Sequence, residues 1–265
     1  MKRAQNIVFM MAVIAYIVIV SGFISDRERT QRINSLRISI VDSTENKFIG
    51  TADIRNLLDR NKFSPIGNES TGIDLRKIEN SLKSRQIIDK AEVFVTEPGI
   101  VHIEISQKTP FVRIFNRYGQ SYYLDRKGNI IPWTHGFSPF VLVANGFIAE
   151  PFSLSKTLNI LDVKHDSISQ SLHTIYDVYR LAGFITADDF WNSQIEQIYV
   201  NNKYEFELIP RVGAHIIELG QIEDMEEKFE NLKILYLRGL NNLGWNQYEK
   251  ISLKYKNQVV CTKIQ

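Results

Sequence analysis

The chain has 265 residues, of which 44% are hydrophobic and 23% are charged, and its formal net charge at pH 7 is +2. This apolar content excludes a disordered tail, and the small net charge excludes a broad electrostatic attraction to nucleic acid. The single cysteine, Cys261, excludes an intrachain disulfide.

An uncharged, almost wholly apolar run lies near the start of the sequence, at residues 7–24. At about 1.5 Å per residue such a run spans roughly 27 Å, close to the hydrocarbon thickness of a bilayer. We expect a tail at residues 1–6 and a transmembrane helix at 7–25. A cleavable signal peptide is the alternative, but its apolar region usually has about 7–15 residues. Cationic residues flank the run on both sides, so the charges leave its orientation open.

A compact pattern follows a polar linker at residues 26–35. Alternating apolar residues predict a strand over 36–40, and two amphipathic helices are expected, one capped by Thr51 and one over 74–85. Two further strands, over 91–95 and 100–105, are separated by Glu97-Pro98-Gly99 and predict a hairpin. The order strand, helix, helix, strand, strand resembles the POTRA module, which we assign to residues 36–107.

The remaining segment, residues 108–265, predicts a second domain of mixed α/β content with an antiparallel sheet. Short strands divided by turns are followed by a helix that begins near Asp166 and stops at Gly183. Three strands come next, and then a second helix that ends at Gly239. The chain closes with a strand that has Ile251, Leu253 and Tyr255 on one face, a tight turn at Lys256-Asn257, and a returning strand over 258–263.

The sequence lacks a persuasive catalytic pattern. The five histidines do not show zinc-binding spacing, and phosphate-binding glycine loops and serine-hydrolase elbows are absent. Asp188 and Asp189 fit the start of a helical turn better than an acid–base pair. Cys261, in a Val-Val-Cys-Thr strand, fits a packing residue better than a nucleophile. We therefore expect a protein that is not an enzyme and binds no cofactor or metal.

The layout as a whole resembles the FtsQ/DivIB family of bacterial cell-division proteins. The resemblance rests on four strings that occur in order behind one apolar segment: Ser106-Gln107-Lys108-Thr109-Pro110, Gly119-x-x-Tyr122-Tyr123-Leu124-Asp125-x-x-Gly128, Pro210 to Gly220 followed by Lys228-Phe229, and Ile251-Ser252-Leu253-Lys254-Tyr255. It implies an α+β protein with one N-terminal transmembrane helix, a POTRA domain (βααββ) and a β domain.

The resemblance also implies a function. Proteins of this family are single-pass type II proteins of the bacterial inner membrane, with periplasmic C-terminal domains, enriched at the division septum. They are non-enzymatic scaffolds that link early and late division proteins and support septal peptidoglycan synthesis. Their implied partners are FtsB-like and FtsL-like small coiled-coil membrane proteins, with other division proteins contacting the POTRA domain. The alternative is a POTRA-containing envelope transport or assembly factor.

The resemblance further implies where a partner docks. In the family the last strand lies at a sheet edge and accepts a partner segment as an added strand. Carried over to this sequence, the partner-binding residues are Tyr255, Gln258, Val259, Val260, Cys261 and Thr262. The alternative for Val259 and Cys261 is simple core packing. Alternation along a strand allows both, because one face packs inward while the backbone edge stays free.

Overall fold

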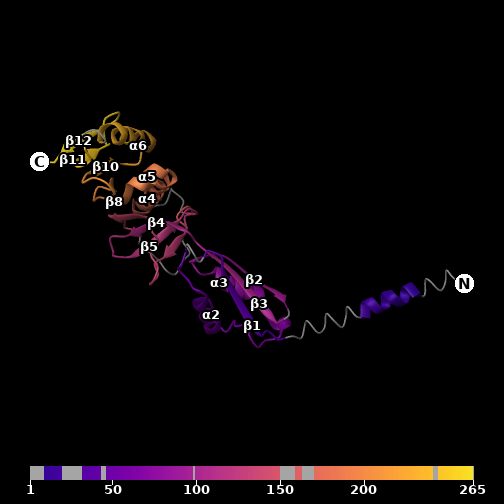
Figure 1. The fold of residues 1–265 in the computed structure, drawn as a ribbon. Helices are drawn as coiled ribbons and strands as arrows, with labels where there is room; N and C mark the ends of the chain where they lie inside the picture. Colours follow the sequence, from indigo (N-terminus) through magenta and orange to yellow (C-terminus); the bar gives the residue numbers. More distant parts are fainter. Residues whose placement is uncertain are drawn as a thin grey trace. The chain divides into compact units, whose positions relative to one another are not determined.

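A computed structural model describes residues 9–19, 32–42, 46–97, 99–149, 159–162, 170–240 and 244–264. The chain divides into two compact units, residues 1–107 and 108–265 (Figure 1).

The apolar run contains a helix over residues 9–19, and its large side chains are exposed. No helix within the described residues has both the length and the hydropathy needed to cross a bilayer. The predicted span over residues 7–25 begins and ends outside the described ranges.

The first unit has the predicted element order. It consists of β1 (Ser35–Ile40), α2 (Thr51–Arg60), a 3-10 turn (Ser70–Gly72), α3 (Leu75–Lys83), β2 (Ile88–Glu97) and β3 (Ile100–Gln107). Within the described residues its three strands form a sheet in the order β1-β3-β2. β3 is central, parallel to β1 and antiparallel to β2.

The two helices of the first unit bury their apolar stripes against this sheet. Ile54 and Leu58 of α2 join a core with Ile78 and Leu82 of α3, as the spacing predicts. The predicted cap of α2 is wrong by one residue: Gly50, not Thr51, is the N-cap, and its N–H donates to Asp53 Oδ2 at 2.9 Å. The Asp53 carboxylate thus satisfies the Gly50 N–H, and the start of α2 is capped without the threonine hydroxyl that the sequence suggested.

A buried amide ties three segments of the first unit together. The Gln107 side chain donates from Nε2 to the Asn46 carbonyl oxygen at 2.6 Å and accepts the Ile49 N–H at 3.0 Å. The Gln107 backbone N–H donates to the Asp42 carboxylate at 3.1 Å. Gln107, the last residue of β3, therefore contacts both ends of the connection between β1 and α2.

The second unit is larger. Its elements are β4 (Pro110–Phe115), β5 (Ser121–Asp125), β6 (Ile130–Pro132), β7 (Leu142–Gly146), α4 (Gln170–Ala187), α5 (Asp189–Gln194), β8 (Ile195–Val200), β9 (Phe206–Pro210), β10 (Ile216–Gly220), α6 (Met225–Ile234), a π-helical turn (Leu235–Leu240), β11 (Tyr248–Ser252) and β12 (Val260–Lys263). Within the described residues the strands form one nine-stranded sheet in the order β12-β11-β10-β9-β8-β7-β4-β5-β6.

The predicted antiparallel sheet is wrong, because this sheet is mixed. β4 pairs with β7, β7 with β8, and β10 with β11, all in parallel. Parallel neighbours need long crossover connections. Here α4 and α5 lie in the connection from β7 to β8, and α6 lies in the connection from β10 to β11.

Helical backbone continues past both glycines that were predicted to end a helix. α4 runs through Gly183 to Ala187, and the turn after α6 runs through Gly239 to Leu240. A glycine ends a helix by adopting positive φ, and neither residue is among those with positive φ. The predicted start of α4 at Asp166 lies outside the described residues. The inward positions Ile175, Val178 and Leu181 are buried as predicted.

A histidine lies inside the aromatic part of the second core. His215 is 2% exposed, and its Nε2 lies 2.8 Å from the Tyr236 hydroxyl oxygen. Trp191 and Trp245 also contact the Tyr236 ring. Burial lowers the pKa of His215 below its ordinary value, although a backbone hydrogen bond involving Trp245 opposes the shift, so the neutral imidazole is the native form.

We predict that Gln107→Leu destabilises the first unit by about 2–3 kcal/mol, because the Asn46 carbonyl and the Ile49 N–H lose their partner inside the protein. Hydrogen exchange of the β1 and β3 amides in the full chain measures this loss. Lys90→Gln, on the exposed side of β2, is the control. Unchanged protection in Gln107→Leu would contradict the assigned role.

We predict that the second unit loses stability as the pH falls below about 6.5, where His215 of the unfolded chain takes up a proton that the folded site disfavours. In the pH range just below 6.5, His215→Gln should reduce the slope of unfolding free energy by up to ~1.4 kcal/mol per pH unit. Denaturant titrations followed by tryptophan fluorescence report it. Equal slopes in the wild-type protein and the His215→Gln variant would refute the prediction.

Candidate interaction edge

β12 is the outermost strand of the nine-stranded sheet within the described residues. It pairs antiparallel with β11, with Ser252 opposite Val260 and Ile251 opposite Cys261. β6, at the other edge, is short and ends in Pro132, which cannot donate a backbone hydrogen bond. Of the two edges, β12 is therefore the one suited to accept another strand.

β11 fixes the position of this edge. Its Ile251 is fully buried, and Leu253 just beyond the strand is 2% exposed. The Leu253 N–H donates to the Glu218 carbonyl at 2.9 Å, which extends the pairing with β10. The predicted third member of this face is wrong: β11 ends at Ser252, and Tyr255 is 58% exposed because the chain has already begun to turn.

The six residues singled out in the sequence fall into three places. Val260, Cys261 and Thr262 lie in β12, Gln258 and Val259 precede it, and Tyr255 lies at the start of the turn. The Tyr255 carbonyl accepts the Gln258 N–H at 3.2 Å. Asn257 adopts a φ of 57°, which agrees with the predicted tight turn.

Side chains along β12 alternate between the two faces of the sheet. Val259 and Cys261 pack against the core, whereas Val260 and Thr262 are exposed on the opposite face. Core packing of Val259 and Cys261 is therefore present, and it leaves the outer backbone edge of β12 uncovered by described residues.

The backbone of β12 also alternates. The Ile264 N–H donates to the Gln247 carbonyl at 3.2 Å, toward β11. Because backbone groups reverse direction at each residue of a strand, the N–H groups of Val260 and Thr262 also face β11, and those of Cys261 and Lys263 face outward. Sequence reasoning missed Lys263, because only the register with β11 decides which residues face out.

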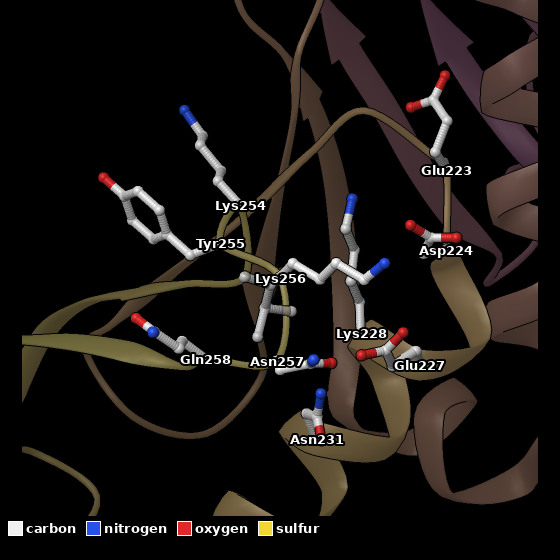
Figure 2. Close-up of a pocket in the computed structure, with 11 residues that line it drawn as sticks. Glu223, Asp224, Glu227, Lys228, Asn231, Lys254, Tyr255, Lys256, Asn257 and Gln258 are labelled. Carbon is white, nitrogen blue, oxygen red and sulfur yellow. The ribbon is translucent and has the colours of Figure 1, made fainter.

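A small pocket of about 130 Å³ lies beside the turn that leads into β12. The first turn of α6 and the preceding loop form one wall, and the segment from Leu253 to Gln258 forms the other. In Figure 2 the side chains of Lys256 and Asn257 extend toward α6, and the Tyr255 ring points the other way. Tyr255 is therefore displayed to solvent rather than used to fill the pocket.

Ionic contacts hold the segment after β11 in place. Lys254 Nζ lies 2.7 Å from Glu205 Oε2, beside β9. This contact lowers the pKa of the Glu205 carboxyl and raises the pKa of the Lys254 ammonium, so both remain charged near neutral pH.

On the α6 side of the pocket, Lys228 donates to the Gln221 carbonyl at 2.7 Å. Burial lowers the pKa of Lys228, while Glu223 and Asp224 oppose that shift.

The residues considered for catalysis have structural positions. Asp188 caps α5 and accepts the Trp191 N–H at 3.1 Å, as expected for the start of a helical turn. Burial raises the pKa of the Cys261 thiol, which disfavours the reactive thiolate. Within the described residues no group of three or more histidine, cysteine or acidic side chains is arranged to hold a metal ion.

Comparison with known proteins agrees with this two-part architecture. Residues 31–106 match the family described as POTRA-like domain. Residues 109–262, more than half of the chain, match the family described as FtsQ/DivIB, C-terminal related. A search of curated proteins finds no match. The chain belongs to the FtsQ/DivIB C-terminal-related family.

Proposed function

We propose that this protein is a non-enzymatic scaffold of the bacterial division complex that docks a partner by β-strand addition at β12. The proposed partners are FtsB-like and FtsL-like small coiled-coil membrane proteins, and the proposed outcome is support of septal peptidoglycan synthesis. The observation that carries the proposal is the backbone edge of β12 at Cys261 and Lys263, which no described residue covers, in a sheet whose other edge strand, β6, ends in Pro132.

Family membership supports this proposal in two ways. The C-terminal match makes FtsB-type and FtsL-type partners the natural candidates, and domains of both matched kinds are typically non-catalytic. It also favours cell division over the alternative of an envelope transport or assembly factor, because the matched region includes β12 up to Thr262.

We further propose that the chain is anchored once in the inner membrane, with both units in the periplasm and enriched at the septum. The support is the uncharged run around residues 9–19, whose helix exposes its large apolar side chains. Such side chains are stable in hydrocarbon and unfavourable in water. The POTRA-like unit would then stand next to the membrane, where other division proteins could contact it.

Backbone pairing alone gives too little affinity. The outward N–H and C=O groups of Cys261 and Lys263 offer about four hydrogen bonds at roughly 1 kcal/mol each. Micromolar affinity requires about 8 kcal/mol, even before the entropy lost on association is counted. Side-chain contacts must supply the rest, and Val260, Thr262 and Tyr255 are exposed next to the edge. Backbone pairing at the edge thus sets the register of the partner strand, and side-chain contacts determine which partner is bound.

We predict that Lys263→Pro weakens binding of a purified FtsB-type and FtsL-type complex about tenfold or more, because proline removes an outward N–H and obstructs strand addition. Its stability should change little, since proline is tolerated where the N–H of an edge strand faces solvent. Titration calorimetry and thermal unfolding of the full chain measure the two effects.

Two variants serve as controls for this test. Lys263→Gln removes the charge but keeps the N–H, so it should bind better than Lys263→Pro. Thr262→Pro removes an N–H directed at β11 and should cost about 1–3 kcal/mol of stability. Wild-type affinity in a folded Lys263→Pro protein would refute docking at this edge.

A further inference from the structure

A second candidate surface lies on the face of the nine-stranded sheet opposite the helices, where Tyr123 and Ser252 are buried and Phe115 and Tyr199 are exposed. Core residues such as Ile198 and Leu208 point toward the helical side. The registers place the alternate residues across the open face in one row: Asn145, Tyr199, Glu207, Glu218, Ser252 and Val260. Arg113 of β4 lies on this face, opposite Val143 of β7 and Tyr123 of β5.

The Arg113 side chain is held in place by neighbours. Its guanidinium carbon lies 4.5 Å from the centre of the Phe115 ring and 5.4 Å from that of Tyr123. Its Nε donates to Ser121 Oγ at 2.9 Å, and its Nη1 donates to Ser138 Oγ at 3.0 Å. Two rings and two hydroxyls therefore fix the direction of this cation without neutralising it.

A second arginine is arranged in the same way nearby. The Arg211 guanidinium carbon lies 4.7 Å from the centre of the Phe140 ring, and Phe140 is 82% exposed. Phe140 is two residues from Ser138, the partner of Arg113, so their Cα atoms lie within about 7 Å of each other. The segment 138–140 thus contacts both guanidinium groups, one through Ser138 and the other through Phe140. We call Arg113, Arg211, Phe115 and Phe140 the arginine surface.

The charges of the arginine surface differ from those elsewhere on the sheet. Near β9 to β11 two carboxylates have cationic partners: Glu205 pairs with Lys254 at 2.7 Å and Glu218 with Lys250 at 3.5 Å. No ion pair is formed by Arg113 or Arg211 with any described carboxylate. Two preoriented guanidinium groups thus keep their positive charge available for an external anion.

We propose that the arginine surface binds an acidic segment of a second protein. Arginine forms paired hydrogen bonds with carboxylates, and exposed aromatic residues beside arginine are typical of the centres of protein interfaces.

This site is independent of the proposed docking edge. In the sheet order, β4 with Arg113 lies six strand spacings from β12, roughly 29 Å at about 4.8 Å per spacing, and β9, which precedes Arg211, lies three spacings from β12, roughly 14 Å. A partner strand on β12 and an acidic segment on the arginine surface could therefore bind together. Failure of one interaction would leave the other unaffected.

The test uses the purified full chain and a fluorescein-labelled hexaglutamate peptide, with hexaglutamine as the uncharged comparison, followed by fluorescence anisotropy. We expect hexaglutamate to bind more tightly than hexaglutamine. The double variant Arg113→Gln/Arg211→Gln should bind it about tenfold more weakly. Arg180→Gln, an exposed arginine on α4, is the matched control and should bind as wild type.

Three results would overturn the proposal: equal binding of the two peptides, wild-type binding by the double variant, or the same loss in Arg180→Gln. Binding of muramyl-glycan fragments that depends on both arginines, without hexaglutamate binding, would also overturn it in favour of a glycan site. If the double variant does not fold, Arg211→Gln alone provides the test, because this exposed residue lies just outside β9.

Discussion

The pairing of β11 with a strand on each side determines which backbone groups of β12 are free at the proposed docking edge. This strand pairs in parallel with β10 and antiparallel with β12, so both of its edges are used. Its apolar residue Ile251 is fully buried, which fixes its register, since a slip by one residue would turn that side chain out of the core. With β11 fixed, the backbone direction of every residue in β12 follows. The outward positions at Cys261 and Lys263 are thus a consequence of core packing.

The helices make this arrangement possible. A β-hairpin turn cannot join parallel neighbours, so α6 is needed to carry the chain from β10 back to the start of β11. The same helix contributes Phe229 and Leu232 to the core beneath the sheet. One face of the sheet is therefore covered by helices, and the open face is left to polar residues, to Lys–Glu pairs and to the arginine surface.

Local patterns predicted the first unit well, because its helices and strands follow regular periodicity. Ile54, Leu58, Ile78 and Leu82 occupy the core positions that helical spacing indicates. The second unit was predicted less well. Individual strands could be recognised, but parallel pairing is a long-range property that alternation does not encode. The sequence also could not show that α4 continues past Gly183, since a glycine ends a helix only where the backbone turns left-handed.

The candidate sites show the same division between local and long-range information. The sequence placed Val260, Cys261 and Thr262 in the last strand, and its edge position was expected from the family resemblance. It could not show that Lys263 faces outward, because that depends on the register with β11. It also could not show that β11 ends at Ser252 and leaves Tyr255 in the turn. The arginine surface contains Arg113 and Arg211, residues far apart in the chain that both contact the segment 138–140. No local motif marks such a pair.

The most direct test of strand addition is residue-resolved amide hydrogen exchange in β12, with and without the FtsB-type and FtsL-type complex. In the free protein the Thr262 amide should be protected by β11, whereas the Cys261 and Lys263 amides should exchange quickly. Addition of the complex should slow exchange at Cys261 and Lys263. If these two amides exchange equally fast in the bound protein, or are already protected in the free protein, strand addition at β12 is contradicted.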